Sequence, residues 1–260
     1  MSRPIKICRH IIVAALVFAL GAFALAQSGA VAGGASEVGP NFAVTLDREP
    51  SHHLAIENQY IRAFKVEVAP HSSTLLHQHD RDYLFVTIGD SSVENDVQSK
   101  APVRLELKDG EVHFTKGGFA HVARNLSDKP FRNITIELMT PSANVAPCDR
   151  TSEQCGFRAN SCMQLGQVTC AVTFQIMAGD GFEVRETDIP AGLITPLHKH
   201  AGPHLAIALT ECDLVNEVEG MAPQKVHMNA GDIAWIPAGP PHKLTNTGSS
   251  MARLIAVEFR

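Results

Sequence analysis

Four histidines near the end of the chain have a spacing that suits metal binding. His198 and His200 are two residues apart, His204 follows, and His242 lies on a later segment. Alternate side chains of a strand point to the same face, so a His-x-His pair presents both imidazoles together. Unpartnered imidazoles inside a barrel would be costly, and a divalent metal satisfies them most simply. The sequence therefore predicts a metal site at these four histidines.

The chemistry of such a site follows from its ligands. Four neutral imidazoles leave the ion its full positive charge, which favours anionic substrates or bound oxygen species. Imidazole suits Fe, Mn, Cu, Ni or Zn, and the sequence does not select among them. Four ligands of an octahedral ion leave two adjacent places for a substrate and for O2 or water. The competing interpretation is a set of surface or hydrogen-bonded histidines in a barrel that has lost its metal.

A second set of histidines occurs earlier in the chain. His77, His79 and His121 repeat the spacing, but Tyr83 takes the fourth place. A phenolate ligand is disfavoured because the pKa of tyrosine is near 10. The neighbouring Asp82 is an alternative ligand, and a purely structural barrel remains open. Four further histidines are expected to face solvent: His52, His53, His113 and His227.

An internal repeat accounts for both sets. Shifting the sequence by 121 residues aligns it with itself, without a gap after Thr74. The matched pairs include His77 with His198, His79 with His200, Gly110 with Gly231, His121 with His242, Asn125 with Asn246 and Glu137 with Glu258. The chain after its N-terminal segment is therefore predicted to be two copies of one unit.

Each copy is expected to consist of strands. Ile61–Val68 and Val103–Leu107 alternate apolar and polar residues, and 84–88 and 205–209 are continuous apolar runs. Turn signals such as Lys108-Asp109-Gly110 separate them, and no amphipathic helix of ordinary length occurs. Regularly spaced short strands predict an all-β sandwich or barrel, with the jelly roll as a natural candidate. Glu137 and Glu258, on the last strand of each copy, are expected to form ion pairs with a neighbouring strand.

These residues resemble the cupin superfamily. Its first motif runs Gly, His-x-His, Glu and Gly, and its second runs Gly, Pro-x-Gly, His and Asn. The second copy matches the first motif except for its last Gly and for His204 in place of Glu. It matches the second motif completely, and the residues are Gly231, Pro237, Gly239, His242 and Asn246. The first copy departs at three places, where His71, Tyr83 and Lys116 replace Gly, Glu and Pro.

The resemblance implies an all-β chain of two tandem double-stranded β-helix (cupin jelly-roll) barrels. The expected divisions are a signal peptide at 1–26, an N-terminal barrel at 41–140, a Cys-containing linker at 141–172 and a C-terminal barrel at 173–260. By family analogy the chain is a metal-dependent oxidoreductase, similar to dioxygenases, acting on a small anionic or enolisable substrate. The alternatives are a non-catalytic metabolite- or metal-binding cupin and a metal-dependent isomerase or decarboxylase. Oxalate chemistry is disfavoured because neither copy has the Glu of the first motif. No residue stands out as a catalytic acid or base in either copy.

The expected partner is a small-molecule ligand or substrate, and a homo-oligomer is left open. Nucleic acid is excluded as a partner because 27 Asp and Glu exceed 22 Lys and Arg. Basic residues before an uncharged apolar run at 11–26, which ends Ala-Leu-Ala, predict a cleaved signal peptide. The run is short for a bilayer span, so an uncleaved anchor is the weaker alternative. The mature protein is therefore expected in the periplasm or outside the cell, without a stable membrane anchor.

Four of the six cysteines lie in one stretch. They are Cys148, Cys155, Cys162 and Cys170, and their gaps are wider than those of a typical zinc knuckle. In an oxidising compartment two disulfides are expected, with the pairing open. Cys212 is expected to be a buried free thiol.

Overall fold

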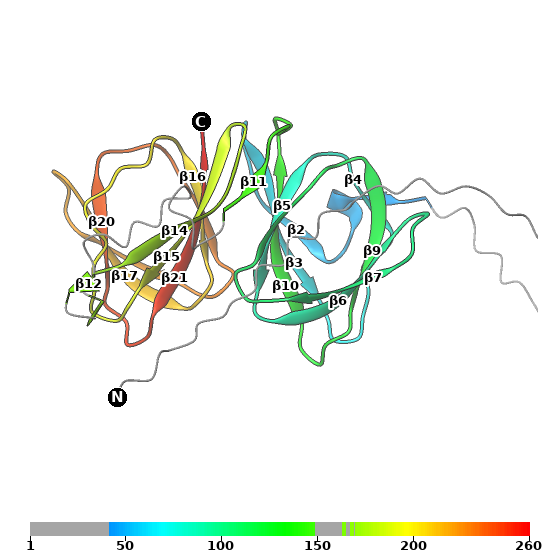
Figure 1. Ribbon diagram of the computed structural model, residues 1–260, viewed down its shortest axis with the longest axis horizontal. Coiled ribbons are helices and arrows are strands. Elements are labelled where there is room, and N and C mark those ends of the chain that lie inside the picture. Colours follow the sequence, from blue (N-terminus) through cyan, green and yellow to red (C-terminus); the bar gives the residue numbers. More distant parts are fainter. Residues whose placement is uncertain (1–41, 149–162, 165–166, 169) are drawn as a thin grey trace, which may run out of the picture. The chain divides into compact units, whose positions relative to one another are not determined.

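The structure, a computed structural model, describes residues 42–148, 163–164, 167–168 and 170–260 (Figure 1). Residues Phe42–Arg260 form one compact unit. Within the described part of the chain, no helix is long and apolar enough to cross a membrane. The predicted signal peptide at 1–26 lies outside the described residues and stays a prediction.

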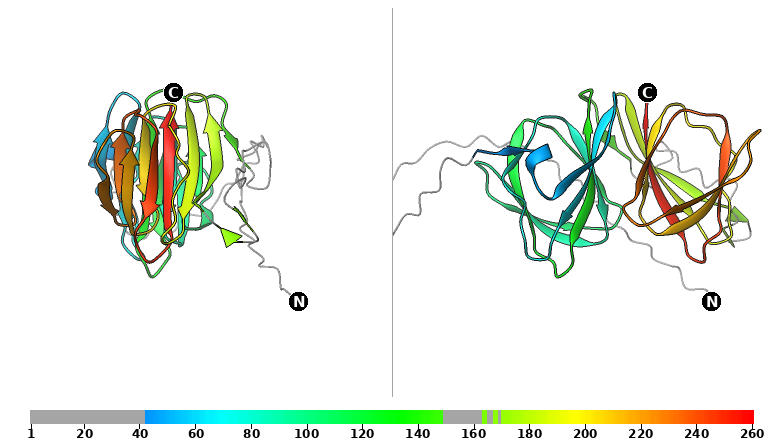
Figure 2. Two further views of the ribbon diagram at one scale, coloured as in Figure 1. Left: turned by 90° about the vertical axis from the view of Figure 1, so that its left-hand side faces the viewer. Right: turned by 180° about the vertical axis from the view of Figure 1, so that it is seen from behind.

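The first repeat forms two five-stranded sheets, in the orders β1-β4-β9-β6-β7 and β2-β3-β10-β5-β8. The first sheet consists of β1 (Val44–Thr45), β4 (His77–His79), β9 (Phe119–Asn125), β6 (Ser91–Val97) and β7 (Val103–Leu107). The second consists of β2 (His52–Glu57), β3 (Ile61–Val68), β10 (Phe131–Leu138), β5 (Tyr83–Ile88) and β8 (Val112–Thr115). A short 3-10 helix, η1 (Leu46–Arg48), joins β1 to β2 inside the ring of strands (Figures 1 and 2).

The second repeat forms sheets in the orders β11-β14-β15-β21-β16-β19 and β18-β17-β20. The larger sheet consists of β11 (Ala146–Pro147), β14 (Val172–Gly179), β15 (Phe182–Ile189), β21 (Ala252–Phe259), β16 (His204–Ala208) and β19 (Ile233–Ile236). The smaller sheet consists of β18 (Gln224–Met228), β17 (Cys212–Val218) and β20 (His242–Asn246). A separate hairpin pairs β12 (Met163–Gln164) with β13 (Gln167–Val168).

The two sets of strands occur at positions 121 residues apart. β3 corresponds to β15, β10 to β21, β6 to β17 and β7 to β18. The pairings correspond as well, since β10 lies between β3 and β5 while β21 lies between β15 and β16. The structure thus confirms the predicted all-β chain of two tandem jelly-roll barrels. The predicted barrel boundaries stay predictions, and β11, within the expected linker, pairs with β14 of the second barrel.

Burial explains why these segments are strands. Seven of the eight residues of β10 are buried, because its neighbours lie on both sides and apolar layers cover both faces. Each barrel has an interior core, with Phe64 in the first and Leu214 in the second. A third core contains residues of both repeats, among them Ile136 and Ile255. The outward faces of the two larger strand layers therefore bury each other, as expected for strands that are apolar throughout.

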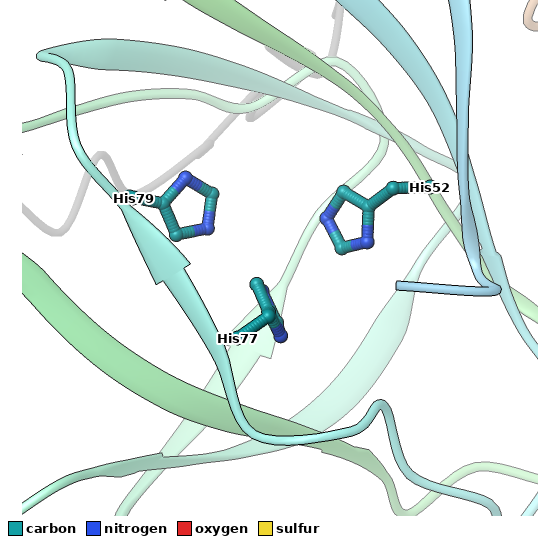
Figure 3. Close-up of side chains that lie close together, drawn as sticks. All are labelled: His52, His77 and His79. Carbon is teal, nitrogen blue, oxygen red and sulfur yellow. The ribbon is translucent and has the colours of Figure 1, made fainter. Parts of the chain in front are cut away.

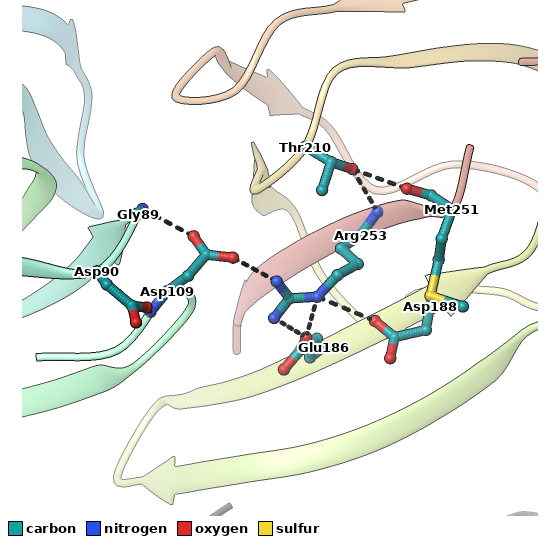
Figure 4. A network of polar contacts seen from close by, with 8 residues as sticks. All are labelled: Gly89, Asp90, Asp109, Glu186, Asp188, Thr210, Met251 and Arg253. Atoms are coloured by element: carbon teal, nitrogen blue, oxygen red, sulfur yellow. Dashed lines mark hydrogen bonds and ion pairs between the residues drawn. The ribbon is translucent and has the colours of Figure 1, made fainter. Parts of the chain in front are cut away.

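Polar contacts also join the two repeats. Arg253 of β21 bonds to the carboxylate of Asp109 in the first repeat, and to Glu186 of β15 at 2.7 Å (Figure 4). Lys65 of β3 donates to Asp232 at 2.8 Å. Trp235 stacks on Tyr60 of the first repeat at 5.6 Å between ring centroids.

The cysteines are only partly described. Cys212 is a buried free thiol, as predicted. Cys148 is buried, and Gln175 donates to its sulfur at 3.2 Å. Cys170 is disulfide-bonded. Cys155 and Cys162 lie outside the described residues, so the two predicted disulfides stay a prediction.

Candidate metal centres

In the second barrel, three of the four predicted ligands lie together. One ring nitrogen each from His198, His200 and His242 lies within 4.8 Å of the other two. His198 and His242 form an isolated antiparallel β-bridge. The backbone N–H of His198 donates to the carbonyl of His242 at 2.9 Å, and that of His242 donates to the carbonyl of His198 at 2.8 Å. Period-two alternation places His200 beside His198, and their ring centroids are 5.3 Å apart.

Each of these three rings is held by an oxygen at Nδ1. His198 donates to the carbonyl of Pro196 at 2.9 Å, His200 to Glu258 at 2.9 Å and His242 to Asn216 at 2.9 Å. An acceptor at Nδ1 fixes the proton there and leaves the Nε2 lone pair free. The site therefore has three oriented nitrogen donors.

The fourth predicted ligand lies beside this group. His204 begins β16, and its ring stacks on that of His200 with centroids 3.8 Å apart. Its side chain is buried, and its Nδ1 has no hydrogen-bond partner in the described part of the chain. It is not one of the three whose nitrogens meet within 4.8 Å. His204 thus supplies an unsatisfied nitrogen at the edge of the cluster.

The cluster opens into a cavity of about 1060 Å³. The mouth includes the Pro237–Pro240 turn, and Leu197 and Ile236 add apolar surface. Among the described residues that line it, Arg185 is the one Lys or Arg and Glu258 the one acid. A small organic molecule fits a cavity of this size.

Burial keeps three histidines of this site neutral, namely His198, His204 and His242. It lowers the pKa of both His204 and His242 to about 4, and neighbouring histidines add to the effect. Burial also lowers the pKa of His198. Glu258 behaves differently, because its bonds from His200 and the Ala201 amide outweigh burial and lower its pKa. Neutral imidazoles beside an ionised carboxylate suit a cation.

The first barrel holds a more deeply buried cluster. His52, His77 and His79 place one nitrogen each within 4.8 Å of one another, and their rings face a common space (Figure 3). His121 lies against them, with its Nε2 3.1 Å from the Nε2 of His79. The predicted residues His77, His79 and His121 are therefore neighbours, and His52 joins them.

The prediction that His52 faces solvent is wrong, since it is 8% exposed. It starts β2 and points inward, whereas His53 points outward and is exposed. Its ring donates from Nδ1 to the buried carboxylate of Glu49 at 2.6 Å. In the second barrel the aligned residue, Thr173, also points inward and lines the cavity.

Neither proposed substitute for a fourth ligand in the first barrel is available. Burial raises the pKa of Tyr83, so its phenol stays protonated, and its ring stacks on His79 at 4.1 Å. Asp82 is bound by Lys116 at 2.9 Å and by the amides of Gly117 and Ser142 at 3.1 Å each. These contacts hold its carboxylate at the barrel rim.

Comparison with known proteins agrees with this architecture. Residues 185–258 match the model of the cupin domain. The second repeat is a cupin domain. The search of curated proteins gave no match.

Solved structures show that the two barrels together have a known fold. AerE from Microcystis aeruginosa has 14% identity, a TM-score of 0.53, and coverage of 82% of this chain and 98% of its own. Salicylate 1,2-dioxygenase from Pseudaminobacter salicylatoxidans has 12% identity, a TM-score of 0.52 and coverage of 80% and 76%. Oxalate decarboxylase from Bacillus subtilis, studied at its Mn(II) centres, has 11% identity, a TM-score of 0.51 and coverage of 81% and 75%. These similarities show the fold and carry no activity over to this chain.

The residues of the second cupin barrel fit a transition-metal ion. Its three oriented imidazoles are borderline ligands suited to such ions, and a carboxylate and an amide fix two of them from behind. The orphaned Nδ1 of His204 is a further polar atom without a partner among the described residues. An unpartnered buried nitrogen beside three oriented imidazoles is expected of a ligand set.

Proposed function

We propose that the chain is a metal-dependent cupin oxidoreductase, similar to dioxygenases, that acts on a small anionic substrate in the second barrel. The observation that carries the proposal is the orientation of His198, His200 and His242. Each donates Nδ1–H to a fixed oxygen and turns its Nε2 towards a cavity large enough for substrate. When bound, a divalent Fe, Mn, Cu, Ni or Zn ion supplies Lewis acidity and, if redox-active, electron transfer.

The cavity favours an anionic substrate because of its charges. An imidazole that ligates a metal ion is neutral, so the three histidines would not offset the charge of the ion. Arg185 adds a guanidinium at the wall, held by Glu183 at 2.7 Å. A carboxylate of the substrate would pair with Arg185 while its other oxygen atoms face the histidines. Leu197 and Ile236 give the remaining surface an apolar character.

One observation favours a non-catalytic binding cupin as the second candidate. An enzyme of this class needs a group that moves a proton near the metal. Glu258 is the acid that lines the described cavity, and both its oxygens are occupied, by His200 Nδ1 and by the Ala201 amide, each at 2.9 Å. His204 is the neighbouring group whose Nδ1 has no partner among the described residues. In an enzyme, His204 would hold and release that proton.

The test separates binding from turnover. Small aromatic and aliphatic carboxylates are titrated into the Co²⁺-loaded protein while its visible spectrum is followed. The proposal predicts saturable shifts that weaken at least tenfold in Arg185→Met. The control, Arg104→Met, removes an exposed guanidinium outside the cavity and is expected to leave them unchanged. O2 consumption by the Fe-loaded protein with the best ligand then tests turnover. Spectral shifts without turnover favour the binding protein, and equal shifts in both variants contradict the anion site.

We also propose that the chain is exported. The support is the basic and apolar pattern at residues 1–26 and the clustered cysteines. N-terminal sequencing of the protein made with its full leader tests this. Cleavage after Ala26 is the expected result, and an intact N-terminus in the cytoplasm would contradict it.

A further inference from the structure

The first barrel contains a histidine cluster with an unusual composition. The imidazoles of His52, His77, His79 and His121 are 8%, 1%, 2% and 9% exposed. Ring centroids of His77 lie 4.8 Å from His52 and 4.4 Å from His121. The buried Nε2 of His77 and Nδ1 of His79 have no hydrogen-bond partner among the described residues. Buried polar atoms of this kind are costly unless a ligand satisfies them.

Three of the four rings are oriented from behind. His52 donates from Nδ1 to Glu49 at 2.6 Å, His77 to the carbonyl of Leu75 at 2.8 Å and His121 to Asn95 at 2.6 Å. Each therefore keeps its Nε2 lone pair for the interior. The Nε2 atoms of His79 and His121 are 3.1 Å apart. Two nitrogens on one tetrahedral ion, with bonds of about 2.0–2.1 Å, would be about 3.3–3.4 Å apart.

The carboxylate that accepts a hydrogen bond from a histidine of the cluster comes from a different strand position in each barrel. In the second barrel Glu258 orients His200. Its counterpart Glu137 instead pairs with Arg62 at 2.8 Å and leaves the Nδ1 of His79 unpartnered. Glu49, which is 2% exposed, supplies a carboxylate at His52. Glu49 also accepts the amides of Ser51 and Leu75, at 2.8 and 3.1 Å, so its position is fixed.

Bulkier side chains surround these rings than surround the histidines of the second barrel. Arg185 and Thr173, which line the cavity of the second barrel, align with Phe64 and His52. Phe64 is fully buried and lies 6.2 Å from His52, and Phe119 stacks on His79 at 5.8 Å. Aromatic and histidine side chains thus fill the space that is open in the other barrel. Structural metal sites are closed in this way, whereas catalytic sites keep an open position.

We propose that the first barrel binds a divalent transition metal through four imidazoles, with His52 of β2 as the fourth ligand in place of Tyr83 and Glu49 behind it, and that this closed site stabilises the fold. The ion satisfies the orphaned Nε2 of His77 and binds the Nε2 of His79, whose Nδ1 stays without a partner among the described residues. The charge of Glu49 partly offsets that of the ion. Because the site is closed, it takes no part in turnover.

The experiment uses the full chain with the other site disabled. In a His198→Ala/His242→Ala background, Zn²⁺ is titrated by calorimetry, and thermal unfolding is measured with and without Zn²⁺. We expect one equivalent of Zn²⁺ to bind and to raise the Tm. Adding His52→Ala should weaken binding at least 100-fold and abolish the rise in Tm. The control His53→Ala, on the same strand but exposed, should change neither.

Two outcomes would overturn the proposal. One is a background variant that is folded by circular dichroism and binds no Zn²⁺. The other is His52→Ala binding with unchanged affinity. If His52→Ala does not fold, Glu49→Gln decides, because it keeps all four imidazoles. A loss of 10–100-fold in affinity supports the orienting role of Glu49, and an unchanged affinity contradicts it. The disabled second barrel keeps this result independent of the proposed activity.

Discussion

The carboxylate of Glu258 gives the sharpest prediction for the metal centre of the second barrel. Its side chain is 7% exposed, and its two oxygens accept one bond each, from His200 Nδ1 and from the Ala201 amide, both at 2.9 Å. Glu258→Gln keeps the volume but has one acceptor oxygen for two donors. One donor then faces an NH2 group, and His200 loses a charged partner. We expect His200 to be a weaker and less well oriented ligand.

The magnitude follows from the role of this contact. Loss of a partner behind a metal-ligating histidine typically costs 10–100-fold in metal affinity, or about 1.4–2.7 kcal/mol. The variant should therefore bind Co²⁺ or Zn²⁺ 10–100 times more weakly at pH 7.5. Competition with a chromophoric chelator measures this directly, with the first barrel either metal-loaded or disabled by His52→Ala.

The repeat supplies a matched control. Glu137→Gln makes the same change at the position aligned with Glu258, but Glu137 bonds to Arg62 and not to a histidine. It should leave the affinity of the second barrel unchanged, whatever its effect on folding stability. Equal affinities in wild type and Glu258→Gln, or equal losses in the two variants, would refute the reasoning.

Three further predictions concern folding stability. Burial lowers the pKa of His77 to about 4 and of His121 to about 3, so the unfolded chain binds protons before the folded one does as the pH falls. The free energy of unfolding should therefore be highest above pH 6.5 and should fall below it, with His77 alone contributing a loss of up to about 3 kcal/mol at pH 4. Urea unfolding of the chelator-treated protein at different pH values measures this. Gly202→Ala should lower the Tm by several degrees and weaken metal binding. A Cβ at this position would lie 1.8 Å from the carbonyl oxygen of Phe259 and would displace the loop between His200 and β16. An unchanged Tm would contradict this prediction. Asn125→Ala should cost about 2–4 kcal/mol in the same unfolding assay, since its amide group donates to the carbonyls of Val68 and Ala69 at the end of β3 and of Lys129 after β9, at 2.7–3.2 Å. A cost below about 1 kcal/mol would show that water replaces these bonds.

The sequence predicted the fold and most of the histidine positions because the repeat carries both. Strand alternation placed His198 and His200 on one face, and the second motif placed His242 opposite them. The sequence did not place His52, because a histidine at the start of a short strand has no pattern that tells inward from outward. Its orientation depends on its hydrogen bond to Glu49 and on the pairing of β2 with β3, and both are features of the tertiary structure.

The carboxylates illustrate the same limit. Glu137 and Glu258 occupy aligned positions on the last strands, and both were expected to form ion pairs with a neighbouring strand. Glu137 does so with Arg62, its partner in the β10–β3 register. The residue aligned with Arg62 is Glu183, which instead pairs with Arg185 and Arg260, so Glu258 has no cation opposite it and turns to His200. One charge reversal on a neighbouring strand thus decides which carboxylate supports a metal ligand.

Elemental analysis of the purified chain tests the central claim most directly. Metal content is measured by mass spectrometry for the wild type, for His198→Ala/His242→Ala, and for the control His227→Ala, which removes an exposed histidine. We predict that the double variant contains one transition-metal ion per chain fewer than the wild type, and that the control matches the wild type. Equal metal content in the wild type and the double variant, including none in either after reconstitution, would contradict the assignment of a metal centre to the second barrel.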